Sequence, residues 1–368
     1  MVAGCVWLSV GMAVDAWAHK NVPSLETFFT PWHGVFYSGF GIVAGIVGGA
    51  VWRNVRRGYP LRLAAPEGYV EATIGLLVFV AGAIGDAIWH ETIGVEKDLA
   101  ALVSPTHLLL FAGITLFVTS PLRAAWRRTD LPWPPGAAGP PLDGVAAART
   151  ARPTLDDGAP LHGDTPRGSL RGHVRPSLND LMPSILSVGL VLTMYSFVTQ
   201  SASPLVEPFA ARIGAATLPA EGRAQFVGQA LGMAGFVLQT ALLVGGLLLL
   251  LRRWWLPFGA ATVLTVMSWA IQLSLSELYP LIGVALAGGL ATDWAIGRLL
   301  GPGDPWWGLP AVGALLPTTL WSGYMLALGL GVGGGLAWEI ELVGGAVCVS
   351  AATGALLGLL ARPVFGQD

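Results

Sequence analysis

The sequence predicts an all-α fold, a polytopic membrane helix bundle of about ten transmembrane helices. Its composition is the first reason, because 54% of the 368 residues are hydrophobic and only 11% are charged. Soluble domains carry about 25% charged residues, so most of this surface must face something other than water. The 50 glycines are a second reason, since they are spread through apolar runs, as expected where helices pack closely in lipid.

Ten apolar runs are the third reason, because each is long enough for a transmembrane helix, which needs about 20 mostly apolar residues. They cover residues 2–19, 33–52, 70–90, 105–125, 180–200, 226–251, 256–276, 278–299, 309–330 and 339–361. Between Leu309 and Trp338, the glycine-rich segment Gly331–Gly335 is a candidate break in the helix.

The first run also has features of a cleaved leader. Ala16-Trp17-Ala18 resembles a signal-peptidase site, but no basic segment precedes the apolar run. We expect this run to be retained as a helix, because its Asp15 and His19 match residues in a later span.

The basic residues gather on one side of a bundle of ten alternating spans. That side carries Arg53, Arg56, Arg57, Arg62, Arg123, Arg127, Arg128, Arg252, Arg253, Arg298 and Arg362. The opposite side carries only Lys20, Lys97, Arg212 and Arg223. Since loops rich in Lys and Arg stay in the cytoplasm, the sequence predicts a multi-pass protein of a bacterial or archaeal plasma membrane with both termini in the cytoplasm.

Residues 126–177 differ from the rest of the chain. They are rich in Pro, Gly, Ala, Asp and Arg and almost lack large apolar residues. Such a segment cannot bury enough surface to offset the entropy of ordering, so we interpret it as a disordered cytoplasmic linker. It divides the chain into a four-helix membrane part, residues 1–125, and a six-helix membrane part, residues 178–368. His162 and His173 lie in the linker and are expected to be solvated.

Two hairpins of the N-terminal part share one order of polar residues. Each has an aspartate, a histidine four residues later near the end of a span, and a Pro-x-His sequence that opens the next span. These residues are Asp15, His19, Pro31 and His33 in the first hairpin and Asp86, His90, Pro105 and His107 in the second. A duplicated hairpin is the simplest origin of this order, and such repeats often build a site at their shared interface.

The spacing predicts that each hairpin brings its polar side chains together. Residues four apart on a helix share a face, and the Pro-x-His histidine faces them from the returning helix. Two imidazoles and one carboxylate with an open position are typical of catalytic zinc, copper or non-haem iron centres. The predicted ligands are Asp15, His19, His33, Asp86, His90 and His107, with Glu26, Glu91 and Glu96 as further ligands, partners of the ligands or proton acceptors.

A structural interpretation competes with the metal site. One Asp–His pair at the membrane surface would favour an ion pair or a polar cap. Two matching hairpins favour a metal or cofactor site, because ionisable groups near the hydrocarbon are costly and by default functional. The sequence leaves open whether the two sets form one centre or two.

Asp15-x3-His19-x13-His33 resembles the Asp-x3-His-x12-His copper-binding pattern in a membrane subunit of the particulate methane and ammonia monooxygenases. In that family the ligands likewise come from the outer ends of neighbouring membrane helices. The resemblance implies copper ligation by this set. The second hairpin, with sixteen residues between its two histidines, would form a less similar set. The likeness covers at most about 25 residues of each hairpin and implies a shared ligand chemistry.

These observations favour a membrane metalloprotein, such as a copper- or iron-dependent oxidase or hydroxylase acting on a small or lipophilic substrate. A zinc site for hydrolysis stays open, and so does whether the protein is an enzyme. A transporter or metal-handling permease is one alternative, although Asp293 is the only candidate for an ionisable group inside the bilayer. A haem held by outer histidines is another. No basic groove indicates nucleic acid, and Cys5 and Cys348 form no CxxC motif.

Overall fold

The computed structural model of the chain describes residues 1–22, 29–94, 98–127, 176–216, 222–301 and 305–362. Across these ranges the chain is helical, and its one β feature is an isolated bridge between Ala211 and Leu336. The predicted all-α class is therefore confirmed for the described residues. The predicted linker falls almost wholly outside them.

Nine stretches of the described residues are helical, long and apolar enough to cross a membrane. They comprise α1 (Val2–Asn21), α2 (Pro31–Arg56), α4 (Val70–Thr92), α6 (Pro105–Val118) continued by α7 (Ser120–Trp126), α9 (Leu178–Val198), α11 (Arg223–Leu251), η2 (Tyr279–Leu281) with α13 (Ile282–Leu299), α14 (Gly308–Gly329) and α15 (Ile340–Leu360). The shorter helices are α3 (Leu61–Ala64), α5 (Asp98–Val103), α10 (Arg212–Ala215), α12 (Ala260–Ser276), η1 (Gln200–Ala202) and η3 (Val332–Gly334).

The predicted span over residues 256–276 forms the shorter helix α12, which has 17 residues. Pro257 and Gly259 precede the helix, and the positive φ of Gly259, +98°, is a conformation that does not continue a helix. A helix of this length rises about 26 Å, slightly less than the hydrocarbon thickness of about 30 Å. Because α12 packs between α9 and α13, protein covers much of its surface.

The candidate break after α14 is confirmed. The helix ends at Gly329, and Gly331, Gly333, Gly334 and Gly335 all have positive φ. This segment lies beside α10, where the amide of Arg212 donates to the carbonyl of Gly335 over 2.9 Å. The chain therefore leaves the bundle here before α15 returns.

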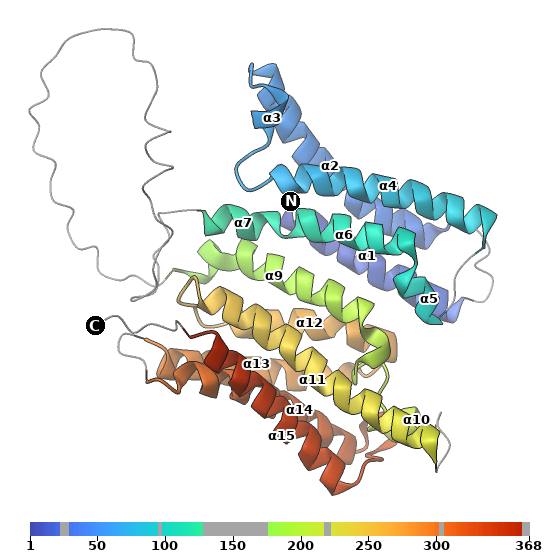
Figure 1. The fold of residues 1–368 in the computed structure, drawn as a ribbon, viewed down its shortest axis with the longest axis vertical. Helices are drawn as coiled ribbons and strands as arrows, with labels where there is room; N and C mark the ends of the chain where they lie inside the picture. Colours follow the sequence, from blue (N-terminus) through green and yellow to red (C-terminus); the bar gives the residue numbers. More distant parts are fainter. Residues whose placement is uncertain (23–28, 95–97, 128–175, 217–221, 302–304, 363–368) are drawn as a thin grey trace, which may run out of the picture.

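The helices form one bundle in which neighbours along the chain pack as antiparallel pairs (Figure 1). The pairs α1–α2 and α4–α6 make its upper half, and α9 and α12 separate them from α11, α13, α14 and α15. The ends of α1 and α4 and the starts of α2 and α6 meet at one end of the bundle, on the right in Figure 1. Both predicted ligand sets lie at this end.

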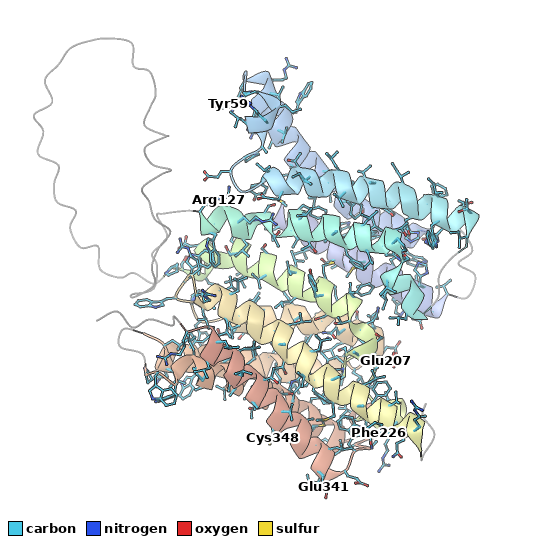
Figure 2. The ribbon with its side chains drawn as sticks, viewed as in Figure 1. Tyr59, Arg127, Glu207, Phe226, Glu341 and Cys348 are labelled. Carbon is cyan, nitrogen blue, oxygen red and sulfur yellow. The ribbon has the colours of Figure 1, made fainter. Side chains whose placement is uncertain are left out.

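Charged residues differ between the two ends of the bundle. In Figure 2, Arg127 lies at the end away from the ligand sets, whereas Glu207 and Glu341 lie toward the opposite end. This distribution agrees with the sidedness on which the prediction of cytoplasmic termini depends. The orientation in a cell stays a prediction.

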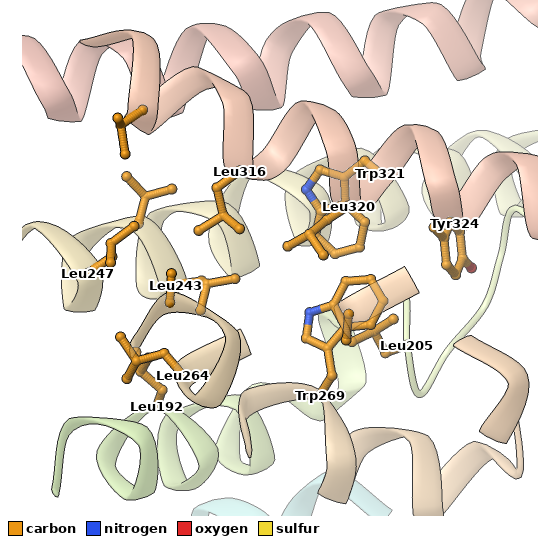
Figure 3. Packing of buried hydrophobic residues seen from close by; sticks show 14 of the residues in the cluster. Leu192, Leu205, Leu243, Leu247, Leu264, Trp269, Leu316, Leu320, Trp321 and Tyr324 are labelled. Carbon is orange, nitrogen blue, oxygen red and sulfur yellow. The ribbon is translucent and has the colours of Figure 1, made fainter. Parts of the chain in front are cut away.

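Buried hydrophobic residues form two clusters, one in each half of the bundle. In the C-terminal half, Trp321 stacks on Trp269 with ring centroids 5.5 Å apart (Figure 3). Trp321 also packs edge to face with Phe236, with ring centroids 4.7 Å apart. Its indole nitrogen donates to Thr240 Oγ1 over 2.8 Å. Aromatic pairs of this kind add about 0.5–1.5 kcal/mol beyond burial, so these rings help to hold α11, α12 and α14 together.

Helix α9 joins the two halves. Its residues Leu190, Met194 and Phe197 belong to the N-terminal cluster although they follow the predicted linker. The hydroxyl of Ser187 also donates to the carbonyl of Val118, at the end of α6, over 2.5 Å. The support for the N-terminal hairpins thus comes partly from the six-helix part of the chain.

Close glycine contacts hold α1 against α2. A Cβ atom added at Gly39 would lie 2.6 Å from the Cα of Leu8, and one added at Gly11 would lie 2.6 Å from the Cα of Phe36. Because these are backbone atoms, no side-chain rotation relieves the clash. The backbones of the two helices can approach this closely only because both positions are glycine.

The pair α4–α6 has the same kind of contacts at matching positions. A Cβ atom at Gly113 would lie 2.7 Å from the nitrogen of Phe79, and one at Gly82 would lie 3.0 Å from the nitrogen of Leu110. Gly82 precedes Asp86 by four residues, as Gly11 precedes Asp15. The two hairpins therefore share their close contacts as well as their polar residues.

The substitution Gly39→Ala is expected to destabilise the α1–α2 pair by about 1–3 kcal/mol, because it forces the two backbones apart. Gly41→Ala on the same helix is the matched control, since a Cβ there meets nothing within 4 Å and alanine favours helix by up to about 1 kcal/mol. Thermal unfolding of the detergent-purified protein, followed by circular dichroism, would show a lower midpoint for Gly39→Ala alone. Equal midpoints for the two variants would contradict the close contact.

Candidate metal centre

The second histidine of each set is placed by the start of its helix. Thr30 caps α2 by accepting from the backbone amide of His33 over 3.1 Å, and Ser104 caps α6 by accepting from the amide of His107 over 3.4 Å. Proline follows the cap in both helices, where its fixed φ suits the first turn. The Pro-x-His sequence therefore fixes the histidine in the first turn of the returning helix.

The first set brings together Asp15, His19 and His33. Asp15 Oδ2 lies 3.7 Å from His19 Nε2 and 3.4 Å from His33 Nε2. One donor atom from each residue lies within 4.8 Å of the other two. Residues from two helices thus converge on one point, and this set could hold a metal ion.

The second set brings together Asp86, His90 and His107. Asp86 Oδ1 lies 3.5 Å from His90 Nε2 and 3.3 Å from His107 Nε2, and the three donors lie within 4.8 Å of one another. Asp86 also accepts a hydrogen bond of 3.0 Å from Thr106 Oγ1. This set could likewise hold a metal ion, and its carboxylate has an additional partner.

The spacing of the donors fits an ion better than an ion pair alone. Two donors that each lie about 2.0–2.2 Å from one ion in a tetrahedral arrangement are about 3.4 Å apart. A charge-assisted N–H···O hydrogen bond is shorter, about 2.7–2.9 Å. All four carboxylate–imidazole distances, 3.3 to 3.7 Å, are close to the first value and longer than the second.

A chain of hydrogen bonds links the carboxylate of Asp86 to the ring of His107 in the second set. An ionised carboxylate only accepts, so Thr106 Oγ1 uses its one hydrogen on Asp86. Thr106 then accepts from Ser104 Oγ, 3.3 Å away. Ser104 Oγ also lies within hydrogen-bond distance of His107 Nδ1, 3.0 Å away, so the chain of hydrogen bonds reaches the ring of His107.

The opposite ring nitrogen of His107, Nε2, faces Asp86 Oδ1 at 3.3 Å. A neutral imidazole nitrogen that carries a lone pair can ligate a cation. A metal ion between these two donors would therefore be held by both.

The first set contains a carboxylate oxygen that can still accept a hydrogen bond or ligate an ion. Asp15 Oδ1 is buried, and among the described residues it has no hydrogen-bond partner. A buried acceptor without a partner costs about 1–3 kcal/mol. Ligation of an ion would remove this cost, so the residues fit a bound metal.

The structure brings together all six predicted ligands, in the two predicted sets, and within the described residues these are the groups whose donors converge. Glu91 is exposed and belongs to neither group. Glu26 and Glu96 lie outside the described residues.

Two polar residues near the sets were not predicted from the sequence. Thr106 is the middle residue of the second Pro-x-His sequence. A comparison of the two sequences would have found it, because the first has Trp32 at this place and the second has a polar residue. Tyr37 lies one turn after His33, with ring centroids 6.2 Å apart, so helical spacing would have found it. The corresponding residue of the second hairpin is Phe111, which has no hydroxyl.

Comparisons of the chain with protein-family models, with curated proteins and with solved structures found no match. The fold and the two convergent donor sets are therefore the basis for a functional proposal.

Proposed function

We propose that the protein is an integral membrane metalloprotein that binds one transition-metal ion in each of its two Asp-His-His sets, on the extracytoplasmic side. The observation that supports this most strongly is the convergence of two matching donor sets, each within 4.8 Å, at the ends of paired membrane helices. Ionisable groups are costly at this depth, and a shared cation is a common reason for their presence.

The donor set narrows the metal to copper, iron or zinc. Imidazole suits all three ions, whereas calcium and magnesium prefer sites made of oxygen. The local resemblance to the copper-binding monooxygenase pattern favours copper among them. Three protein donors leave a coordination position open, so we propose that the centre acts on a small or lipophilic molecule, as a membrane oxidase or hydroxylase would.

Two features of the geometry argue against a transporter. Asp293 accepts from the amides of Ala261 and Thr262, over 2.9 and 3.0 Å, and from Thr262 Oγ1 over 2.6 Å. It therefore caps the start of α12 and is not available as a site in a pathway. Within the described residues the other buried acid is Asp86, which lies in a candidate metal set.

A haem fits the donor arrangement less well than a small ion. A bis-histidine haem needs two imidazoles on opposite faces of a planar macrocycle. In the first set both imidazoles instead face one carboxylate oxygen, at 3.4 and 3.7 Å, and the rings are tilted by 54°. The space between them suits a single ion.

We further propose that the two hairpins arose by duplication. The matching positions of the close glycine contacts support this, because they extend the likeness from the ligands to the whole helix pair. Repeats related in this way place equivalent residues on the same side of the membrane, which explains why both sets lie at one end of the bundle.

We expect the wild-type protein, purified in detergent and loaded with copper, to retain two ions per chain. A variant with Asp15, His19 and His33 all changed to Ala should retain one, as should the variant with Asp86, His90 and His107 changed, because each set has three donors of its own. Inductively coupled plasma mass spectrometry of the purified protein measures this ratio.

The matched control changes His162 and His173 to Ala, which removes two histidines of the predicted linker and should leave two ions bound. Size-exclusion profiles would show whether every variant stays folded. Full retention of both ions by a well-folded triple variant would contradict the assignment of that set. Parallel loading with zinc and iron would identify the preferred metal.

Thr106→Val should weaken metal binding by the second set about 10–100-fold, because removing a partner of a ligating carboxylate commonly costs this much. The effect is best measured in the variant with Asp15, His19 and His33 changed to Ala, because only the second set can then bind metal. Thr115→Val is the matched control, since its hydroxyl bonds only to the carbonyl of Phe111 in its own helix. Competition with a chromogenic chelator measures the dissociation constants. The same constant in both variants would show that Thr106 does not support the site.

A further inference from the structure

The two donor sets are immediate neighbours. The ring of His33, from the first set, meets the ring of His90, from the second, edge to face with centroids 6.1 Å apart. The rings of His19 and His33 are 5.6 Å apart, and those of His90 and His107 are 6.2 Å apart. Four imidazoles therefore form a continuous row across both hairpins.

This row limits the distance between two bound ions. An ion bound through Nε2 lies about 2.0–2.1 Å from the nitrogen and hence about 3.2 Å from the ring centroid. With the ring centroids of His33 and His90 6.1 Å apart, the two ions are at most about 13 Å apart.

The two sets differ in their exposure. In the second set the side chains of Asp86, His90 and His107 are 2%, 3% and 22% exposed. In the first set those of Asp15, His19 and His33 are 18%, 33% and 9% exposed. The carboxylate and one imidazole of the second set are therefore covered by protein, whereas the first set is the more exposed of the two.

The sets also differ in how firmly their ligands are held. Thr106 and Ser104 hold Asp86 and His107 in the second set through a chain of hydrogen bonds. The place of Thr106 is taken in the first hairpin by Trp32, which instead packs edge to face against Trp17 with centroids 6.3 Å apart. Preorganised ligands bind more tightly and release an ion more slowly, and in the first set Asp15 Oδ1 has no such hydrogen-bond partner among the described residues.

We infer that the two sets form one paired metal centre with unlike halves. The closed half, Asp86 with His90 and His107, fills first and keeps its ion. The open half, Asp15 with His19 and His33, exchanges its ion and takes a small exogenous ligand, such as a small anion, at its vacant position. This inference rests on the proposed function, because it requires both sets to bind metal.

Electron paramagnetic resonance of the copper-loaded protein tests the pairing. With two Cu(II) ions per chain, we expect a half-field transition or dipolar broadening of the signal, since unpaired electrons this close interact. The two triple-alanine variants, each keeping one half, are the matched controls and should give ordinary isolated signals. A wild-type spectrum equal to the sum of the two control spectra overturns the pairing but leaves the proposed function standing. Fewer than two bound copper ions overturns the proposed function itself.

Ligand binding and ion release test the difference between the halves. Azide should change the copper spectrum of the variant that keeps the open half and leave the other variant unchanged. An excess of chelator should remove copper from the open half at least about tenfold faster than from the closed half. Equal azide responses, or equal release rates, overturn the assignment of open and closed halves even where the pairing holds.

Discussion

The arrangement of the N-terminal hairpins depends on a buried carboxylate that two imidazoles share. Removing Asp86 from water costs several kcal/mol, and this cost is offset only when positive charge and hydrogen-bond donors surround the group. Thr106 supplies one donor. The Nε2 atoms of His90 and His107 lie 3.5 and 3.3 Å from Oδ1 of Asp86. In the proposed centre, a metal ion shared by these three donors supplies the positive charge.

Glycine contacts deep in each hairpin make this convergence geometrically feasible. Helices normally pack with their axes 8–10 Å apart, and short carboxylate and imidazole side chains would then have to reach across a wide gap. Contacts such as that of Gly39 with Leu8 and of Gly113 with Phe79 bring the backbones close. The packing of small residues near the middle of each pair thus determines the donor distances at its end.

Local sequence patterns predicted most of the helices and the six residues of the two donor sets. The features that the sequence did not predict depend on packing between distant segments and on the local backbone. The spacing of Asp15 from His19 and the Pro-x-His start of α2 are properties of a few neighbouring residues, so the sequence was sufficient to find them. The shortness of α12 follows from the backbone at Gly259, which apolarity alone does not report. Glu91 follows His90 directly in the sequence, but it is exposed and belongs to neither donor group. The contact of His33 with His90 depends on how two separate hairpins pack, which no local spacing reports.

The difference between the two halves comes largely from the middle residue of Pro-x-His. At a membrane boundary tryptophan has a favourable role of its own, since its indole fits the region between lipid and water, and Trp32 takes this role with Trp17. A threonine at the same place has no such role and turns its hydroxyl to the carboxylate. Two hairpins with the same ligands can thus place one half of the proposed metal centre near the surface and bury the other half. In a paired centre of this kind, one ion stays firmly bound while the other exchanges. A small molecule can then bind at the exchangeable ion and leave again while the rest of the site keeps its structure.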